Sequence, residues 1–395
     1  MHEQNKIRYL PYLIIFHEIA IYLSNDMYLP SMPTIANDLH LTQDQTQSTL
    51  TMWFFGASAL QFILGPLSDR FGRKSIIVFG GISYIISSLT CAIVSDLPIF
   101  LLARFVQGTA VCSVLVAGYA AIHELFNTKD AIKILAIMGA IIILAPAFGP
   151  LVGALIVQFY NWRYIFWLLF IMGSISTLLL IAFMPESNKN RRNLHLPTIT
   201  KGYYKIIFNM DFMLPCLSYC LLCAISYLWI FEAPFLMIEV YGYTPVYYGI
   251  SQASIFGCFF FGAALLKYLL ERYTLSAIIN ISTIVSFFIC ILFIITAKLF
   301  NNMLLSVLCL MGISTVTSVL FGPLNRLAID ASSQPMGSRT AVFSTILNLF
   351  GALIGSLLML VQITNLTKAA VIITGFMGLA MLLIMFLTQQ RHINN

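Results

Sequence analysis

Charged side chains are scarce in this chain. Asp, Glu, Lys and Arg make up 9% of its 395 residues, whereas soluble globular proteins carry about 25%. Hydrophobic residues make up 59%, and the mean hydropathy is +0.90. A water-soluble core cannot hide so much apolar surface. The composition therefore excludes a soluble globular protein and indicates one that crosses a membrane several times.

Short alternating apolar runs, which are typical of membrane barrel strands, are also missing. The sequence instead contains runs of about 20 apolar residues, which is the length of a helix that spans a ~30 Å hydrocarbon layer. We therefore expect an all-α membrane protein. The twelve predicted spans are residues 9–29, 46–67, 76–94, 97–118, 132–157, 163–184, 211–238, 247–268, 275–297, 302–325, 339–361 and 367–388.

Metal-spaced sets of cysteine and histidine are absent from the sequence. All eight cysteines fall in predicted helices, and the six histidines are scattered at His2, His17, His40, His123, His195 and His392. We therefore expect no disulfide framework, no metal, no cofactor and no enzymatic centre. Cys216, Cys220 and Cys223 share a helix face, where we expect them to pack.

A cleavable signal peptide is not visible either. The first apolar run is too long for a signal peptide, and no cleavage site with small residues follows it. We therefore expect the first helix to stay in the membrane.

Lys and Arg are distributed unevenly between the two sides of the predicted membrane. Of the 21, 17 lie on the side of the termini, Arg163, Lys298 and Lys368 lie on the opposite side, and Arg104 lies in the fourth span. Cytoplasmic loops of membrane proteins carry an excess of basic residues. We therefore expect both termini in the cytoplasm, and we interpret the basic loops as topology signals rather than as a nucleic-acid site.

Residues 185–208 form the longest polar stretch, between the sixth and seventh predicted spans. We interpret this stretch as a cytoplasmic linker between an N-terminal bundle, residues 1–184, and a C-terminal bundle, residues 209–395. Two six-helix repeats with a site at their interface are a recurring design of transporters.

A polar motif, GPLSDRFGRK, follows the second span at residues 65–74. Its glycines allow close approach of the backbone, and its acid and three bases can form an ion-pair latch to nearby helix ends. We expect a tight cytoplasmic turn with a gating role for Gly65, Asp69, Arg70, Gly72 and Arg73.

This motif resembles the loop motif of the major facilitator superfamily. LARFVQG at residues 102–108, with Arg104, resembles the fourth-helix motif of the same family. APAFGPLVG at residues 145–153 resembles its fifth-helix antiporter motif, and NWRYIFW at residues 161–167 resembles the start of the sixth helix in drug:proton antiporters. There are two departures. Ala154 replaces a usual glycine, and the second half has only a faint repeat of the loop motif, at residues 267–273.

The first span indicates which groups of the superfamily this chain resembles. HEIAIYLSNDMYLP at residues 17–30 is similar to both the Bcr/CflA drug-resistance group and the MdfA-like multidrug transporters. This resemblance implies a twelve-helix major facilitator fold in two six-helix bundles, in a bacterial inner membrane. It also implies a monomer that exports lipophilic or cationic drugs in exchange for protons, by alternating access.

Two carboxylates lie in the first span, Glu18 and Asp26. A charged side chain at the centre of a bilayer costs roughly 2.5–3.5 kcal/mol on insertion scales, and such residues usually face a cavity. Eight residues separate the two acids by about 12 Å along a helix and by about 80° around it. We therefore expect both acids and Tyr22 to line one cavity wall, with Arg104 as a counter-charge, and to couple protons to substrate.

Other residues are weaker candidates for this cavity: Asn25, Trp53, Tyr119, Tyr227 and Glu232. Glu232 lies within the membrane if its helix continues past Pro234 and at the interface if it stops there. Glu18 could instead pair with His17 or a backbone group, and Arg104 could serve as a packing donor to backbone carbonyls.

Small residues recur every fourth position in the fifth span, at Ala145, Gly149 and Gly153. Such a spacing lets helices approach closely, and Pro146 and Pro150 add a bend. We expect this contact to combine packing with sealing of the cavity.

Three alternatives remain at this point. An integral-membrane enzyme would need a metal or catalytic cluster near the membrane surface, and the six scattered histidines argue against it. The same fold could export or import a siderophore or another metabolite, although polyanionic cargo should need more basic cavity residues than Arg104. A receptor or structural role would leave the intramembrane acids unexplained.

Overall fold

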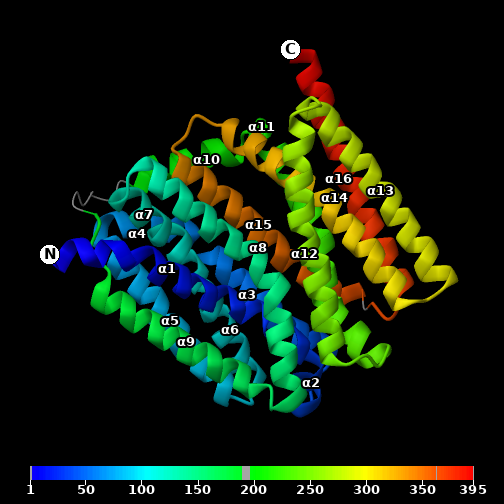
Figure 1. Cartoon of the computed structure of the whole chain (residues 1–395), viewed down its shortest axis with the longest axis horizontal. Helices are drawn as coiled ribbons and strands as arrows, with labels where there is room; N and C mark the ends of the chain where they lie inside the picture. Colours follow the sequence, from blue (N-terminus) through cyan, green and yellow to red (C-terminus); the bar gives the residue numbers. More distant parts are fainter. Residues whose placement is uncertain (1, 189–195, 362, 395) are drawn as a thin grey trace. The chain divides into compact units, whose positions relative to one another are not determined.

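The chain is helical throughout the part that its structure describes. The computed structural model describes residues 2–188, 196–361 and 363–394, and none of these forms a strand. The predicted all-α class is therefore confirmed. The chain divides into two compact units, Met1–Thr200 (unit 1) and Lys201–Asn395 (unit 2), coloured blue to green and green to red in Figure 1. Residues 189–195 of the predicted linker lie outside the described residues.

Unit 1 contains the following elements in chain order: α1 (His2–Asp26), η1 (Leu29–Ser31), α2 (Met32–Asp38), α3 (Gln43–Ala59), α4 (Gln61–Phe71), α5 (Arg73–Ile93), α6 (Leu97–Ser113), the π-helical η2 (Val114–Gly118), α7 (Tyr119–Leu125), α8 (Thr128–Phe159) and α9 (Arg163–Phe183).

Helix α10 (Leu196–Ile207) crosses the boundary between the units. Unit 2 then contains α11 (Met210–Pro234), the π-helical η3 (Phe235–Val240), α12 (Pro245–Leu270), α13 (Leu275–Leu299), α14 (Met303–Asp330), α15 (Met336–Val361) and α16 (Leu366–Asn394).

The two units repeat one pattern of helix packing. In unit 1, α1 packs on α6, α8 and α9, α5 packs on α6 and α9, and α3 packs on α6. In unit 2, α11 packs on α14, α15 and α16, α13 packs on α14 and α16, and α12 packs on α14. Helices in corresponding chain positions therefore have corresponding neighbours, which is the mark of an internal repeat.

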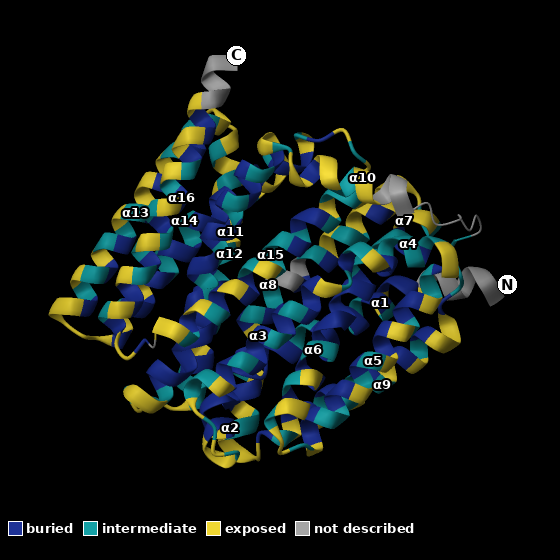
Figure 2. Ribbon diagram, turned by 180° about the vertical axis from the view of Figure 1, so that it is seen from behind, coloured by how far each residue is buried: buried dark blue, intermediate teal, exposed yellow. Residues whose placement is uncertain are grey.

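Nine helices of the described chain are long and apolar enough to cross a membrane, or eleven if two bent pairs each count as one span. The predicted first span, α1, is not among them, because its polar residues and two acids lower its mean hydropathy. Many large apolar side chains are exposed, including Ile86, Phe261 and Leu382. Figure 2 shows exposed positions in yellow along the helices of both units. Such a surface suits lipid rather than water.

Three predicted spans differ in detail from the structure. The second consists of two helices, α3 and α4, that meet at Leu60 and are bent by 45°. The fourth continues through η2 to Leu125, and the seventh continues past Pro234 as η3. Proline lacks an N–H group and so breaks the regular hydrogen-bond ladder. A π-helical turn keeps the chain helical beyond such a break.

Candidate functional site

Glu18 and Asp26, the two acids of the predicted first span, are buried inside unit 1. Glu18 is 0% exposed and Asp26, the last residue of α1, is 2% exposed. The Tyr119 hydroxyl donates a hydrogen bond to Glu18 Oε1 at 3.3 Å. The second carboxylate oxygen, Oε2, finds no hydrogen-bond partner among the described residues. His17 is not the partner of Glu18, because its Nδ1 lies 2.9 Å from Ser176 Oγ on α9.

Asp26 lies at a close contact between α1 and α8. The Asn25 side-chain amide donates to Asp26 Oδ1 at 3.1 Å. A Cβ atom added to Gly149 would lie 2.5 Å from Asp26 Cβ, and one added to Gly153 would lie 2.0 Å from the Met27 carbonyl oxygen. Two glycines of the fifth-helix motif therefore allow α8 to pack directly on the backbone that carries the acid.

Arg104 of α6 is fully buried beside the end of α1. Its Nη1 donates to the Ser24 carbonyl at 2.9 Å and to Gln107 Oε1 at 2.6 Å. Its guanidinium carbon lies 4.5 Å from the centre of the Tyr28 ring, a cation–π distance. No direct ion pair joins it to Asp26 in the described structure. Arg104 therefore binds a backbone carbonyl two residues before Asp26, while its Nε and Nη2 have no hydrogen-bond partner among the described residues.

Ser24 links these groups, and the sequence analysis missed it. Its carbonyl accepts from Arg104, its hydroxyl donates to the Ile21 carbonyl at 2.6 Å, and the hydroxyl also accepts from Trp53 Nε1 at 3.1 Å. Trp53 is 3% exposed. The signal was available, because a small hydroxyl residue between two intramembrane acids can bond to neighbouring helices.

The remaining candidates fall in two places. Tyr22 is half-buried and lies within electrostatic range of Glu18, Tyr119 and Asp26. Tyr227 and Glu232 lie on α11 of unit 2, where Glu232 is 0% exposed. The chain stays helical past Pro234 as η3, which is the condition under which the sequence places Glu232 within the membrane.

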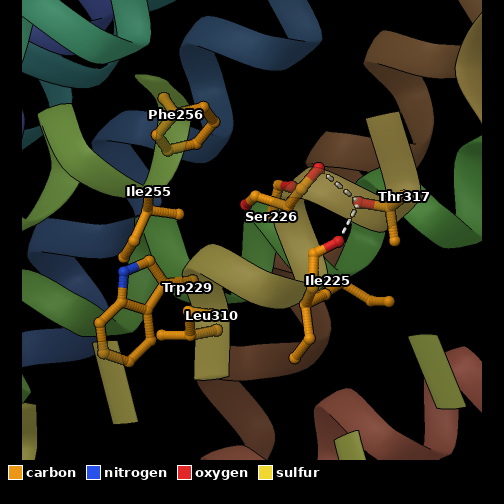
Figure 3. A pocket seen from close by; sticks show the side chains of 9 residues that line it. Ile225, Ser226, Trp229, Ile255, Phe256, Leu310 and Thr317 are labelled. Atoms are coloured by element: carbon orange, nitrogen blue, oxygen red, sulfur yellow. Dashed lines mark hydrogen bonds between the residues drawn. The ribbon is translucent and has the colours of Figure 1, made fainter. Parts of the chain in front are cut away.

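Unit 2 has a small pocket of its own (Figure 3). Its volume is about 10 Å³, room for roughly one water molecule. The pocket is lined by apolar and hydroxyl side chains, among them Ser226, Trp229, Phe256 and Thr317. Trp229 Nε1 donates to Gln252 at 3.1 Å. The polar contacts around this pocket are therefore neutral, unlike those around Arg104.

The GPLSDRFGRK motif turns at a single residue. Gly65 and Asp69 lie inside α4, which continues to Phe71, and α5 begins at Arg73. The whole reversal takes place at Gly72, whose φ of +101° is a conformation that side chains disfavour. One glycine suffices because the residues on either side remain helical.

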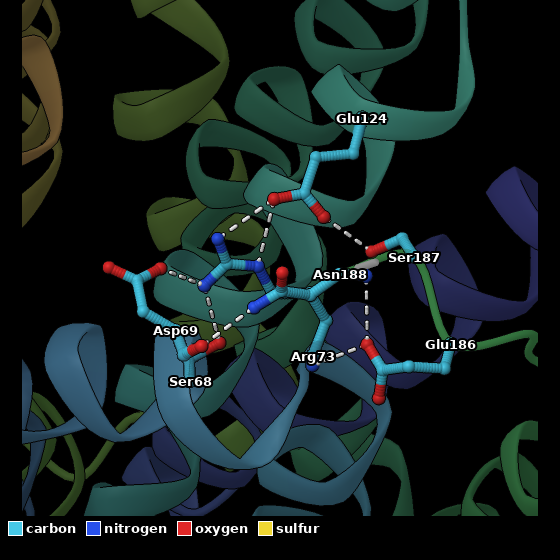
Figure 4. A network of polar contacts seen from close by, with 7 residues as sticks. All are labelled: Ser68, Asp69, Arg73, Glu124, Glu186, Ser187 and Asn188. Atoms are coloured by element: carbon cyan, nitrogen blue, oxygen red, sulfur yellow. Dashed lines mark hydrogen bonds and ion pairs between the residues drawn. The ribbon is translucent and has the colours of Figure 1, made fainter. Parts of the chain in front are cut away.

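Arg73 is the centre of a polar cluster around this junction (Figure 4). Its guanidinium forms ion pairs with Asp69 at 2.6 Å and with Glu124, the penultimate residue of α7, at 2.8 Å. Arg70 does not take part in this cluster, because its guanidinium carbon lies 5.3 Å from the centre of the Phe71 ring.

Residues after α9 complete the cluster, and the sequence analysis did not identify them. Glu186 Oε1 accepts from the Arg73 backbone N–H at 2.8 Å, and the Asn188 side chain donates to the Asp69 carbonyl at 2.8 Å. The Ser187 hydroxyl donates to Glu124 at 2.6 Å. A Cβ atom on Gly72 would lie 2.1 Å from Glu186 Oε2. The start of the predicted linker therefore forms hydrogen bonds with the ends of α4 and α7 and with the start of α5.

Another ion pair joins the end of α2 to the start of α9. Asp38 Oδ2 accepts from Arg163 Nη1 at 2.6 Å and from Trp162 Nε1 at 3.0 Å. These hydrogen bonds lower the pKa of Asp38 below its usual value. The Trp162 ring packs on Phe100 and Phe166, at 6.1 and 6.0 Å between ring centres. The predicted sixth-helix motif therefore has an acidic partner that sequence alone did not identify.

Comparison with known families decides where the chain belongs. The family model described as "Major Facilitator Superfamily" matches residues 14–356. The chain belongs to the major facilitator superfamily. The resemblance inferred from its motifs is confirmed, and with it a multi-pass carrier of small molecules.

Three relatives of this major facilitator chain are multidrug proteins. Multidrug resistance protein MdtM of Escherichia coli (strain K12) is 28% identical over 250 residues, which are 63% of this chain and 61% of that protein. Multidrug transporter MdfA of Escherichia coli O6:H1 is 31% identical over 270 residues, which are 68% and 66%. MdfA of Edwardsiella ictaluri is 32% identical over 254 residues, which are 64% and 62%. Each match spans less than two thirds of the relative.

Solved structures support the major facilitator fold. A bacterial homologue of the human lysosomal transporter Spinster was crystallised inward-facing, both unoccupied and occupied. These structures match with TM-scores of 0.74 and 0.75 over 97% of both chains, at 14% identity. At this identity the match establishes the fold alone, in agreement with the predicted fold class.

Proposed function

We propose that this chain is a bacterial inner-membrane exporter that moves lipophilic or cationic drugs outward in exchange for protons. The observation that carries the proposal is the pair of buried carboxylates on α1, Glu18 and Asp26, neither of which forms an ion pair with another described residue. Intramembrane acids of this kind mark proton and substrate pathways. The drug cargo is supported by the likeness to MdfA and MdtM.

The two acids have separate roles in this proposal. Asp26 carries the proton, because the close contact with Gly149 couples its position to that of α8. Glu18 contacts cationic drugs together with Tyr22 and Tyr119, since its second oxygen is left without a hydrogen-bond partner among the described residues. Arg104 stabilises the charged form of Asp26 through its position at Ser24.

The other predicted residues have further roles in this proposal. Residues 1–184 and 209–395 act as two bundles that alternate access, joined by residues 185–208, with both termini in the cytoplasm and the protein a monomer. Gly65, Asp69, Arg70, Gly72 and Arg73 gate the cytoplasmic side, and Pro146, Gly149, Pro150 and Gly153 seal the cavity. Asn25, Trp53, Tyr227 and Glu232 line the path.

Transport in proteoliposomes with an imposed pH gradient tests the proposal. Asp26→Asn should abolish pH-driven transport of both a cationic and a neutral lipophilic dye. Glu18→Gln should slow the cationic dye more than the neutral one, because it removes an attractive charge from a site of low dielectric constant. Glu271→Gln, at an exposed acid after α12, is the matched control and should leave transport unchanged.

Two outcomes would contradict the proposal. Unchanged pH-driven transport in Asp26→Asn, with normal folding, would remove Asp26 from proton coupling. Failure of the wild type to move any dye, while it moves an anionic metal chelate, would favour the metabolite transporter instead.

A further inference from the structure

Helix α10 presents a basic and aromatic face. Four residues form this face: Lys201, Tyr204, Lys205 and Phe208. They are three or four residues apart, or adjacent, and therefore lie on one side of a helix. The Phe208 N–H donates to the Tyr204 carbonyl, so the last turn includes Phe208. Both lysines are exposed, Tyr204 is 63% exposed and Phe208 is 67% exposed. The two rings lie 4.3 Å apart between centres.

The other side of this helix is already occupied by unit 2. Ile206 is 0% exposed, and the Asn209 side chain donates to the Ala331 carbonyl at 3.0 Å, between α14 and α15. A Cβ atom on Gly202 would lie 3.3 Å from Gln334 Oε1 in the same connection. Figure 2 shows exposed residues along α10 beside less exposed ones. The helix is therefore fixed to unit 2, and the exposed face is a stable feature.

The position of α10 along the chain places this face at the membrane surface. Helix α11, one of the helices able to span a membrane, begins at Met210, two residues after Phe208. Two residues extend the chain by at most about 7 Å. The face therefore lies near the end of a span, on the side that the distribution of basic residues assigns to the cytoplasm.

Charge identifies the occupant of the face. Between Glu186 and Asp211 the sequence has five Lys or Arg residues and neither Asp nor Glu. The cytoplasmic leaflet is rich in anionic lipid, which attracts basic residues next to a span. Aromatic side chains favour the same interface, because their rings are amphipathic. A water-facing helix would gain nothing from two large exposed rings.

We propose that the face formed by Lys201, Tyr204, Lys205 and Phe208 binds the headgroup of an anionic phospholipid. The ammonium groups contact the phosphate, and the paired rings insert beside the acyl chains. This lipid site is independent of the cargo and of proton coupling, so it does not depend on the proposed transport activity.

Lipid titration of the delipidated full chain, followed by native mass spectrometry, tests this site. Wild-type protein should bind phosphatidylglycerol more tightly than phosphatidylcholine. Lys201→Gln should weaken phosphatidylglycerol binding by about fivefold, and Lys201→Gln with Lys205→Gln by about 30-fold, with phosphatidylcholine unaffected. Raising the salt concentration should weaken binding to the wild type and have less effect on the double variant.

The matched control is Lys129→Gln with Lys133→Gln at the start of α8. These lysines are also exposed and four residues apart, and they should not affect lipid affinity. A second test is Tyr204→Ser with Phe208→Ser, which should weaken phosphatidylglycerol binding while its salt dependence remains. Three results would each overturn the proposal. The first is an equal loss of phosphatidylglycerol affinity in the two lysine double variants, and the second is full affinity in Lys201→Gln with Lys205→Gln. The third is effective competition by inorganic phosphate.

Discussion

The two units share one pattern of helix packing but differ in what they bury. Unit 1 buries Glu18, Asp26 and Arg104, whereas Glu232 is the one Asp, Glu, Lys or Arg side chain that unit 2 buries among the described residues. Arg104 binds a carbonyl on α1, while in unit 2 neutral groups, Trp229 and Gln252, join α11 to α12. Apolar and small residues suffice to build the repeat. The three buried charges of unit 1 are therefore not required by the packing pattern that the two units share.

The junctions that correspond in chain order differ in the same way. Between α4 and α5 an ion-pair cluster surrounds Gly72, with Arg73 at its centre. Between α12 and α13, Arg272 lies over the Tyr268 ring at 4.4 Å instead. At this junction unit 1 therefore has an ion-pair cluster, whereas unit 2 has a cation–π contact.

Removing the buried charge of Arg104 should have the largest effect on stability. Arg104→Met deletes two charge-assisted hydrogen bonds, to Ser24 and Gln107, and should destabilise unit 1 by about 3 kcal/mol. Gln252→Leu, which removes neutral bonds to Trp229 and Tyr248, should cost about 1 kcal/mol. Hydrogen exchange of α1 and α6, compared with α11 and α12, measures both. Equal losses of stability in Arg104→Met and Gln252→Leu would show that the charge of Arg104 adds nothing to the stability of unit 1.

Close helix packing gives the next largest effect. Gly153→Ala places a methyl group 2.0 Å from the Met27 carbonyl oxygen and should cost about 1–3 kcal/mol by forcing α8 away from α1. At Gly375 of α16 no atom lies within 4 Å of an added Cβ. Gly375→Ala should therefore be neutral or stabilising by up to about 1 kcal/mol, from helix propensity.

Thermal unfolding in detergent compares these two alanine variants. A loss of stability in both would mean that glycine at these positions serves flexibility. A loss in neither would mean that α8 can move away from Met27 without cost.

Sequence predicted the helical class and most spans, because lipid-length apolar runs depend on local composition. It also predicted the close approach of α8, since small residues at a four-residue spacing permit little else. It did not predict that Arg73 would meet Glu124 and Glu186, or that Arg163 would meet Asp38. These partners are distant in sequence, and surface acids look alike until folding brings one of them to a particular arginine. The tight turn expected within residues 65–74 takes place at Gly72 alone, because one glycine with a positive φ is enough to reverse the chain.

Weakening the cluster around Arg73 should cost less stability than the changes in the interior of unit 1. Glu124→Gln removes the acceptor charge for Arg73 and should destabilise the α4–α5 junction by about 1 kcal/mol, as expected for a partly exposed pair. Arg272→Gln at the α12–α13 turn should cost less, because its partner is a neutral ring on an exposed side chain. Hydrogen exchange of residues 68–76 and 267–276 tests the difference. Equal protection in Glu124→Gln and the wild type would contradict a locking role for the cluster.

The smallest expected effect is the pH dependence of the ion pair between Asp38 and Arg163, which joins α2 to α9. Asp38 has a lowered pKa, so its contribution to stability is present above its unfolded pKa of about 3.9 and is lost as the pH falls through the folded value. Asp38→Asn should therefore cost about 0.2–1 kcal/mol at pH 7 and progressively less as the pH falls through the folded pKa of Asp38. In unit 2, a neutral hydrogen bond from Tyr241 to Asn301, at 2.5 Å, lies after the first long helix and its π-helical end. Tyr241→Phe should cost the same at pH 7 and at low pH. Unfolding of both variants across this pH range measures the difference, and parallel pH curves would remove the ionic contribution of Asp38.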